Sequence, residues 1–326
     1  MAIIWRSASR MPIALLIVLC VAVLTACGSN PPPPTATPPP VGQWLRKASM
    51  QEERSWIGMA SVEGKIYAIG GMTGSLGRRL DLTEVYDPQK NTWTYLRPMP
   101  TARSSVGVVA VGTRIYAIGG FPETGVTTAV EVFDTERNQW RTGLAPMPTK
   151  RFDLTLSAIG NTIYAIGGYD LREMNIVEAY DTVGDRWSSL PPLPTARYAL
   201  QSLVVNGKIW AMGGRNADGP TDMIEVFDPA TRQWSPGGKL PTPLAGFGAA
   251  LADDGLHIVK YDLHYRYNFQ SGLWSKLPAM LTSRHGLQLT YIDGLLFAVG
   301  GCMPGDGTLF DVAKNEAFVI RAPSKR

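Results

Sequence analysis

The chain has 326 residues, of which 45% are hydrophobic and 18% are charged, and its formal net charge is +4. So small an excess of positive charge over this length gives no support for a nucleic-acid partner. Its 34 glycines and 25 prolines are typical of a β protein rich in turns and argue against a helical one.

The first 27 residues have the layout of an export signal. Arg6 and Arg10 make the start basic, and the apolar stretch Met11–Leu24 is short for a membrane span. The segment ends in Leu24-Thr25-Ala26-Cys27, which resembles the bacterial lipobox. An uncleaved signal anchor, or an ordinary signal peptide that happens to contain Cys27, is the alternative. The resemblance implies that residues 1–27 are a lipoprotein signal peptide and that Cys27 carries a lipid. That lipid would hold the protein on the extracytoplasmic side of a bacterial cell membrane.

A proline-rich segment follows at residues 28–43. Seven of the ten residues from Pro31 to Pro40 are proline. Such a segment cannot build a core and favours extended polyproline II, at about 3.1 Å per residue. We therefore expect a tether between the membrane and a domain over 44–326; a disordered spacer would serve nearly the same purpose.

The three cysteines agree with this division. Cys20 lies in the apolar signal core and Cys27 is the predicted lipid site, so only Cys302 belongs to the domain. The domain therefore has no intrachain disulfide to form, and its stability must come from packing.

Two kinds of residue recur at regular intervals along 44–326. Tryptophans recur every 47 residues at Trp93, Trp140, Trp187 and Trp234, and a further one follows at Trp274. Glycine pairs recur in step, at Gly70-Gly71, Gly119-Gly120, Gly167-Gly168, Gly213-Gly214 and Gly300-Gly301. The last interval is close to two periods, so a degenerate repeat fills 244–277, with Lys260-Tyr261 where the glycines should be. The chain therefore contains six repeats.

One full repeat, 103–148, predicts four short strands. Val106–Val111 and Ile115–Ile118 are apolar runs on either side of a turn, and Val130–Asp134 and the segment around Trp140 complete the unit. No helical periodicity follows the signal. A four-stranded unit of this kind cannot bury both faces alone, but a closed ring of such units can.

The combination of Arg, apolar strand, Ile-Tyr-x-Ile-Gly-Gly, Val-Glu-x-Tyr/Phe-Asp and Trp resembles the kelch motif. The resemblance covers 44–326 and implies an all-β, six-bladed β-propeller with four antiparallel strands per blade. Two segments resemble an outermost strand for the last blade. One is Trp44–Arg54; the other is Glu316–Arg321, with Phe318 in the tryptophan position. Both cannot fill one slot, and we favour the N-terminal segment.

Arginine and glutamate also recur together. The arginines are Arg54, Arg103, Arg151, Arg197 and Arg284, and the glutamates are Glu84, Glu131, Glu178 and Glu225. The degenerate repeat has lost both, since Leu244 and Tyr265 stand in their places. A ring of arginines could form an anion site around the channel. Because the two residue types are present and absent together, we predict structural ion pairs instead.

Function is expected where the repeats differ. In kelch propellers that bind ligands, the pocket is lined by the residue after each arginine and by the loop after each glycine pair. Carried over by position, the first set is Ser55, Ser104, Phe152, Tyr198, Ala245 and His285. The second set is Met72, Phe121, Tyr169, Asp170, Arg215, Asn216 and Cys302. Aromatic faces with a few polar groups suit sugars or extended peptides, and Arg215 could hold a carboxylate. Variable loop residues with no shared ligand are the alternative.

Catalytic motifs are mostly lacking in the sequence. His257, His264 and His285 show no metal-type spacing, and Cys302 has no matched partners for a copper radical site, so neither metal nor cofactor is expected. We predict a monomeric, non-catalytic scaffold that binds a glycan, a cell-wall fragment or a protein segment, or that docks an envelope partner. The alternative is a sugar-modifying enzyme that resembles the periplasmic kelch mutarotases of sialic acid, with Asp170 or His285 moving protons.

Overall fold

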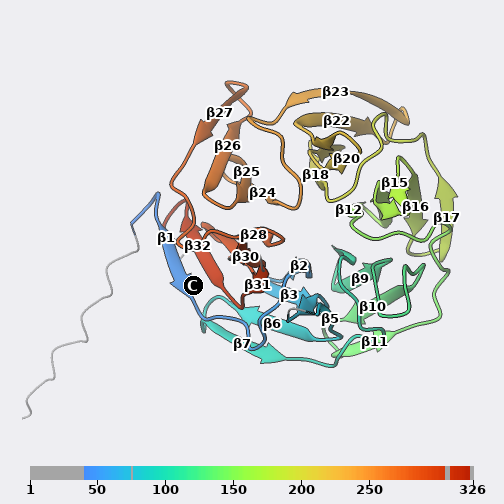
Figure 1. Cartoon of the computed structure of the whole chain (residues 1–326), viewed down its shortest axis with the longest axis horizontal. Coiled ribbons are helices and arrows are strands. Elements are labelled where there is room, and N and C mark those ends of the chain that lie inside the picture. Colours follow the sequence, from blue (N-terminus) through green and yellow to red (C-terminus); the bar gives the residue numbers. More distant parts are fainter. Residues whose placement is uncertain (1–39, 75, 305–308, 324–326) are drawn as a thin grey trace, which may run out of the picture. The chain divides into compact units, whose positions relative to one another are not determined.

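The structure is a computed structural model that describes residues 40–74, 76–304 and 309–323. Six four-stranded antiparallel sheets, or blades, stand in a ring around a central axis (Figure 1). This arrangement confirms the predicted six-bladed propeller. Cys27 and the predicted tether up to Pro39 lie outside the described residues. The described part of the chain contains no apolar helix of membrane-spanning length.

Each blade runs from an innermost to an outermost strand. Blades I to III are β2 (Gly58–Val62), β3 (Lys65–Ile69), β6 (Thr83–Asp87), β7 (Thr92–Tyr95); β8 (Gly107–Val111), β9 (Arg114–Ile118), β10 (Val130–Asp134), β11 (Gln139–Arg141); and β12 (Thr155–Ile159), β13 (Thr162–Ile166), β16 (Val177–Asp181), β17 (Arg186–Ser189). Blades IV to VI are β18 (Gln201–Val205), β19 (Lys208–Met212), β22 (Met223–Asp228), β23 (Gln233–Lys239); β24 (Gly248–Ala252), β25 (Gly255–Lys260), β26 (Leu263–Asn268), β27 (Leu273–Lys276); and β28 (Gln288–Ile292), β29 (Leu295–Val299), β32 (Asn315–Val319), β1 (Trp44–Lys47).

The second strand of each blade explains why the sheets stack. In β9, every residue after Arg114 is buried, so side chains on both faces of the strand lie in apolar surroundings. Tyr67 and Ile69 of blade I pack with Ile115 and Phe133 of blade II in one cluster. The core is therefore a series of clusters between neighbouring blades.

The glycine pairs lie where neighbouring blades approach most closely. Gly119 has φ +64°, and a Cβ added there would lie 2.6 Å from the carbonyl oxygen of Arg151 in the next blade. At Gly70 the equivalent distance to the oxygen of Arg103 is 2.5 Å. Glycine is therefore required both by the backbone conformation and by the space between blades.

The last blade contains both terminal strands. β1 pairs with β32, which in turn pairs with β29, so the N-terminal strand is outermost and the C-terminal strand is third (Figure 1). The favoured placement of the N-terminal segment as the outermost strand is confirmed, and the alternative was wrong, because the C-terminal segment forms the adjacent third strand. Trp44 lies opposite Phe318 and supplies blade VI with the outermost-strand tryptophan that the other five blades also have. Phe318 takes the Tyr/Phe position of the third strand.

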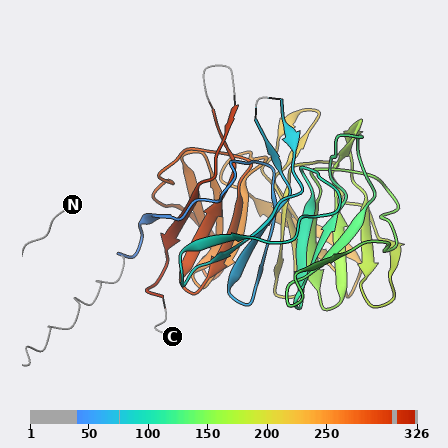
Figure 2. The same ribbon diagram turned by 90° about the horizontal axis from the view of Figure 1, so that it is seen from below.

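Four blades carry a short extra hairpin after the second strand. These hairpins are β4–β5 (Met72–Thr73, Arg78–Arg79), β14–β15 (Tyr169–Asp170, Arg172–Glu173), β20–β21 (Arg215–Asn216, Gly219–Pro220) and β30–β31 (Cys302–Pro304, Leu309–Asp311). They extend from one face of the ring, which is uppermost in Figure 2. That face is called the mouth below.

Candidate functional site

The structure brings the two predicted sets of binding residues together at the mouth. Each residue that follows a repeated arginine forms an isolated β-bridge with the residue that follows a glycine pair. The five bridged pairs are Ser55–Met72, Ser104–Phe121, Phe152–Tyr169, Tyr198–Arg215 and His285–Cys302. The two sets therefore lie side by side around the axis, and whether they bind a ligand stays a prediction.

The floor of the mouth is a closed ring of backbone hydrogen bonds. The six residues of the ring lie two positions after each repeated arginine or its replacement; they are Trp56, Ser105, Asp153, Ala199, Gly246 and Gly286. Each amide donates to the carbonyl of the residue before it in the ring, over 2.9–3.1 Å, and the amide of Trp56 closes the ring on Gly286. The same residues line a central cavity of only about 50 Å³. A ligand would therefore lie across the mouth and not through the channel.

Four aromatic rings form a continuous row over blades II to IV. The ring centroids of Phe121 and Phe152 are 5.1 Å apart, those of Phe152 and Tyr169 are 5.6 Å apart, and those of Tyr169 and Tyr198 are 4.9 Å apart. The guanidinium of Arg79 lies 4.8 Å from the centroid of Phe121. These pairs are tilted or edge-to-face, the arrangements that aromatic side chains prefer.

Blade V presents a different surface because it has no glycine pair. The Lys260 ammonium donates to the carbonyl of Ala245 at 2.6 Å and lies 5.1 Å from the ring centroid of Tyr261. The Tyr261 ring is also 5.1 Å from that of His285. Burial, and next the charge of Arg215, lowers the pKa of Lys260. Position-by-position carry-over missed Lys260 and Tyr261, although the loss of the glycines marked them.

Three acidic residues of the mouth are Asp170, Asp153 and Asp311. Asp170, the predicted acid, forms an ion pair with Lys150, with Nζ 3.3 Å from Oδ2. Burial raises the pKa of Asp153, on the floor, to about 6, and burial also raises the pKa of Asp311.

His285 and Cys302 are neighbours in the mouth. Burial, and next Lys260, lowers the pKa of His285, so its ring is neutral at pH 7. Burial, and next Asp311, raises the pKa of Cys302 to about 11. A thiol with so high a pKa is protonated at neutral pH and is a poor nucleophile.

The repeated arginines do not line the channel. All five are fully buried, and each pairs with the glutamate of its own blade. Arg103 Nη1 is 2.9 Å from Glu131 Oε2, and its Nη2 donates to the carbonyl of Ala117. Blade VI completes the pattern with Glu316, which sequence reasoning missed because it considered this segment only as a candidate for the outermost strand.

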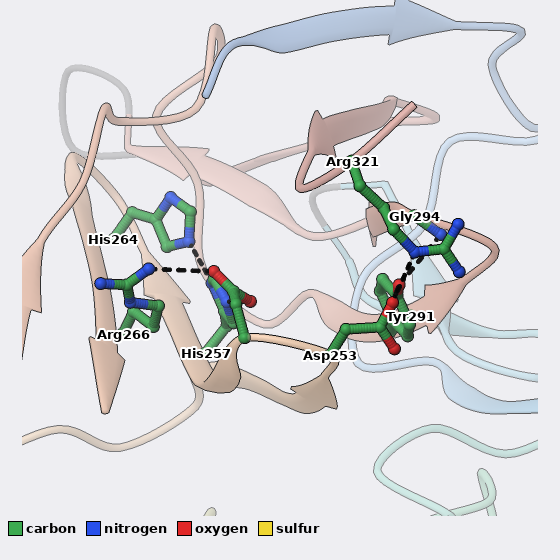
Figure 3. Close-up of polar contacts among 8 residues, drawn as sticks. Asp253, His257, His264, Arg266, Tyr291, Gly294 and Arg321 are labelled. Atoms are coloured by element: carbon green, nitrogen blue, oxygen red, sulfur yellow. Dashed lines mark hydrogen bonds and ion pairs between the residues drawn. The ribbon is translucent and has the colours of Figure 1, made fainter. Parts of the chain in front are cut away.

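The other two histidines form a buried chain between blades V and VI (Figure 3). His264 Nδ1 lies 3.1 Å from the carbonyl oxygen of Pro278, which can only accept, so His264 Nε2 accepts from His257 Nδ1 at 2.9 Å. His257 Nε2 is 2.8 Å from Asp254 Oδ1, and Arg266 is 3.1 Å from Oδ2 of the same carboxylate. Both ring nitrogens of His257 therefore lie within hydrogen-bond distance of a partner.

This chain of side chains is not a metal site. The described residues contain no group of three or more His, Cys, Asp and Glu side chains suited to a metal ion. Burial, and next the charge of His257, lowers the pKa of His264 to about 3. Beside the chain, Arg321 and Tyr291 both contact Asp253, which ties the end of β32 to blade V (Figure 3). The cluster therefore holds the seam between two blades.

Comparison with known proteins agrees with the repeats. Residues 43–193 match the family model described as KLHDC2/KLHL20/DRC7 Kelch-repeats domain, and residues 196–241 match the Kelch motif. Kelch-like protein 35 of Mus musculus is 35% identical over 98 residues, which are 30% of this chain and 17% of that protein. An F-box/kelch-repeat protein of Arabidopsis thaliana is 42% identical over 52 residues, which are 16% of this chain and 15% of that protein. Each match thus covers less than a fifth of the relative's length.

Proposed function

Because this chain is a kelch-repeat protein with a six-bladed β-propeller, we propose that it is a monomeric binding scaffold. In this proposal it holds a segment of a partner protein across the mouth. The observation that carries the proposal is the convergence of the two variable residue sets, paired by five β-bridges, on one face. The repeated residues support the blades instead, so the mouth is where this chain differs most between repeats.

Exposed apolar side chains on the hairpins favour a protein partner. Leu76 is 96% exposed, Leu171 is 90% exposed and Phe310 is 55% exposed, and they lie on three different hairpins of the mouth. Leu171 also has φ +64°, which is unfavourable for a leucine and common at functional positions. Large apolar side chains exposed to solvent around the mouth are typical of protein interaction sites.

The partner would meet the propeller outside the cell membrane. We propose that Cys27 carries a lipid after cleavage of the signal and that residues 28–43 form the tether. Radiolabelled palmitate is expected to label the wild-type protein and not Cys27→Ser, which should leave the membrane fraction. Membrane retention of unlabelled Cys27→Ser would contradict the lipid anchor.

Site-specific photocrosslinking tests the mouth. A photoreactive amino acid at Leu171 or Phe310 is expected to crosslink a partner in cells, and one at Leu273 on outer strand β27, which is 66% exposed, is not. Combining the Leu171 crosslinker with Phe152→Ala and Tyr198→Ala should abolish the product. Equal crosslinking from Leu273 would refute the mouth as the binding face.

A glycan is the second candidate ligand, and the aromatic row favours it because sugar rings stack on aromatic faces. A thermal-shift screen of the full-length protein in detergent would detect it. A ligand at a hundred times its dissociation constant adds about 2.7 kcal/mol to the free energy of unfolding. A shift with sugars, together with no crosslinked protein, would favour the glycan and justify an anomer-exchange assay for the mutarotase alternative.

A further inference from the structure

We infer that the face of the propeller opposite the mouth rests on a lipid bilayer, so that the mouth is turned away from the membrane. That face is lowermost in Figure 2 and is called the lower face. The contact is made by an aromatic patch on blades IV and V, which consists of Trp210, Tyr267, Phe269, Leu273 and Trp274. The inference rests on the proposed lipid anchor and goes beyond the proposed binding function, because it states which way the mouth points.

The chain enters the propeller at the lower face of blade VI. β29 ends at the glycine pair of the mouth, and β32 runs antiparallel to it with Val319 opposite Leu295. Val319 therefore lies at the end of the blade away from the mouth. The amide of Gly42 donates to the carbonyl of Val319 at 2.8 Å. A tether that leads to Gly42 thus reaches the propeller on the side opposite the mouth.

The turn between the third and fourth strands of blade V is the least polar of its kind. It lies at the lower face, because β25 ends at the mouth and β26 runs back from it. Residues 269–273 of this turn contain no charged side chain, whereas the equivalent turns of blades I to IV contain at least one each. Phe269 stands where those turns carry proline or threonine, and Leu273 where they carry threonine, glutamine or arginine. Phe269 is 41% exposed and Leu273 is 66% exposed.

Three half-buried rings support the exposed Phe269. Its ring centroid lies 5.3 Å from that of Tyr267 and 5.7 Å from that of Trp210, which belongs to blade IV. The Tyr267 ring is in turn 5.1 Å from that of Trp274, the neighbour of Leu273. Tryptophan and tyrosine are the residues that membrane proteins concentrate at the boundary between lipid and water. The patch therefore has both the composition and the partial exposure of a membrane contact.

Most charges on the strands around the patch are paired with one another. Three pairs have N···O distances of 3.0, 3.1 and 2.6 Å; they are Lys208–Asp228, Arg266–Asp254 and Arg321–Asp253, the last two of which contribute to Figure 3. Arg232 and Lys276, on the outer parts of blades IV and V, are exposed and have no acidic partner in the described part of the chain. Both are positive, which is the sign that lipid phosphates attract.

The small size of the patch favours a tethered membrane contact over a protein interface. Its two most exposed side chains offer far less area than the roughly 800 Å² per partner that a stable protein interface buries. An anchor in the bilayer would keep the patch within the reach of the predicted tether, about 40 Å, and a link of this kind gives effective concentrations in the millimolar range. A contact too weak to hold a free protein is therefore sufficient for an anchored one.

The exposed apolar side chains of the mouth offer the opposite orientation. Leu171 is 90% exposed, and its insertion into lipid would close the mouth against the membrane. The tether would then have to pass around the outside of the ring, because Gly42 lies at the other face. The two orientations predict opposite results for labels on the two faces.

Quenching of fluorescence by lipid tests the orientation. A fluorescent amino acid is placed at Gln270, in the turn of blade V, of the full-length protein anchored in phosphatidylcholine vesicles. A label carried about 5–10 Å into the boundary between headgroups and acyl chains lies within reach of brominated acyl chains, so its emission should fall about twofold or more. A label at Leu171 should keep its emission. The matched control is Glu136, the equivalent position in blade II across the ring, where quenching should be weaker.

A pair of substitutions tests the patch itself. Phe269→Thr with Leu273→Gln gives blade V the residues that blade II has at the same positions, Thr135 and Gln139. This variant should stay in the membrane fraction and lose the quenching at Gln270. Should it fail to fold, the comparison of Gln270 with Leu171 in the wild-type background still decides the orientation.

The outcomes separate this inference from the proposed anchor and from binding at the mouth. Quenching at Leu171 and not at Gln270 would overturn the inference and leave the anchor intact, as would equal quenching at Gln270 and Glu136 or none at any position. A wild-type protein that takes up no palmitate and stays soluble would overturn the anchor and this inference together. Photocrosslinking of a protein from Leu171 tests binding at the mouth separately.

Discussion

The indole N–H of Trp44 donates to the carbonyl oxygen of Pro278, 2.8 Å away and 234 residues later in the chain. Every other blade has the same contact between its outermost tryptophan and the backbone of the blade before it; the five donors are Trp93, Trp140, Trp187, Trp234 and Trp274. β1 therefore does more than complete the sheet of blade VI, because it also joins blade VI to blade V. Closure of the ring depends on this strand.

Replacing Trp44 with alanine should strongly destabilise the propeller. The side chain is buried against His264 and Phe318, so Trp44→Ala is expected to lower the free energy of unfolding by about 3–5 kcal/mol. Trp44→Phe, which loses mainly the hydrogen bond, should cost nearer 1 kcal/mol. Urea unfolding followed by circular dichroism measures both. A loss below about 0.5 kcal/mol for the alanine variant would show that β1 is not needed for closure.

Breaking one arginine–glutamate pair should cost more than removing it whole. Arg103→Ala leaves Glu131 buried without its partner, which is expected to cost about 3–5 kcal/mol. Arg103→Met combined with Glu131→Leu keeps the volume apolar and should recover at least half of that loss, as blade V tolerates Leu244 and Tyr265. The double-mutant cycle gives the coupling between the two residues. Additive losses would mean that the two side chains act independently.

Most of the fold could be predicted because it repeats. The spacing of the tryptophans and glycine pairs marks the blades, and the joint presence of Arg103 and Glu131 marks their pairing. The place of the C-terminal strand could not be predicted, since Phe318 and Trp44 are both aromatic and either could stand in the tryptophan position of an outermost strand. Only the pairing of β1 with β32 distinguishes the third strand from the fourth. The same ambiguity hid Glu316.

The residues of the candidate site could be predicted only in the repeats that keep both the arginine and the glycine pair. The pairing of Tyr198 with Arg215 follows from counting positions after the arginine and after the glycines. The contact of Lys260 with Ala245 cannot be predicted in this way. Blade V has no glycine pair, so there is no position in this blade from which to count. The contact of His264 with Pro278 lies within blade V and is made to a backbone carbonyl, which no side-chain pattern records.

The glycine pairs should prove essential for packing between blades and not only for the turn. Gly119 and Gly112 have nearly the same φ, +64° and +61°, but only Gly119 faces a neighbouring blade. Alanine at either position pays about 1–2 kcal/mol for the left-handed conformation. Gly119→Ala also places Cβ against the oxygen of Arg151, so it should cost about 1–3 kcal/mol more than Gly112→Ala in chemical denaturation. Equal losses would show that only the turn conformation matters.

Acid should weaken the seam between blades V and VI. The pKa of His264 is lowered from 6.5 to about 3 in the folded protein, so between these values the unfolded chain binds the proton more tightly. Stability is therefore unaffected above about pH 6.5 and is lost as the pH falls toward 3, at up to about 1.4 kcal/mol per pH unit. Denaturation at several pH values should show a steeper acid loss for the wild type than for His264→Gln. Nitrogen-15 NMR at pH 5 should find the His264 ring neutral. A His264 ring that titrates near pH 6.5 would contradict the hydrogen-bond order deduced from the carbonyl of Pro278.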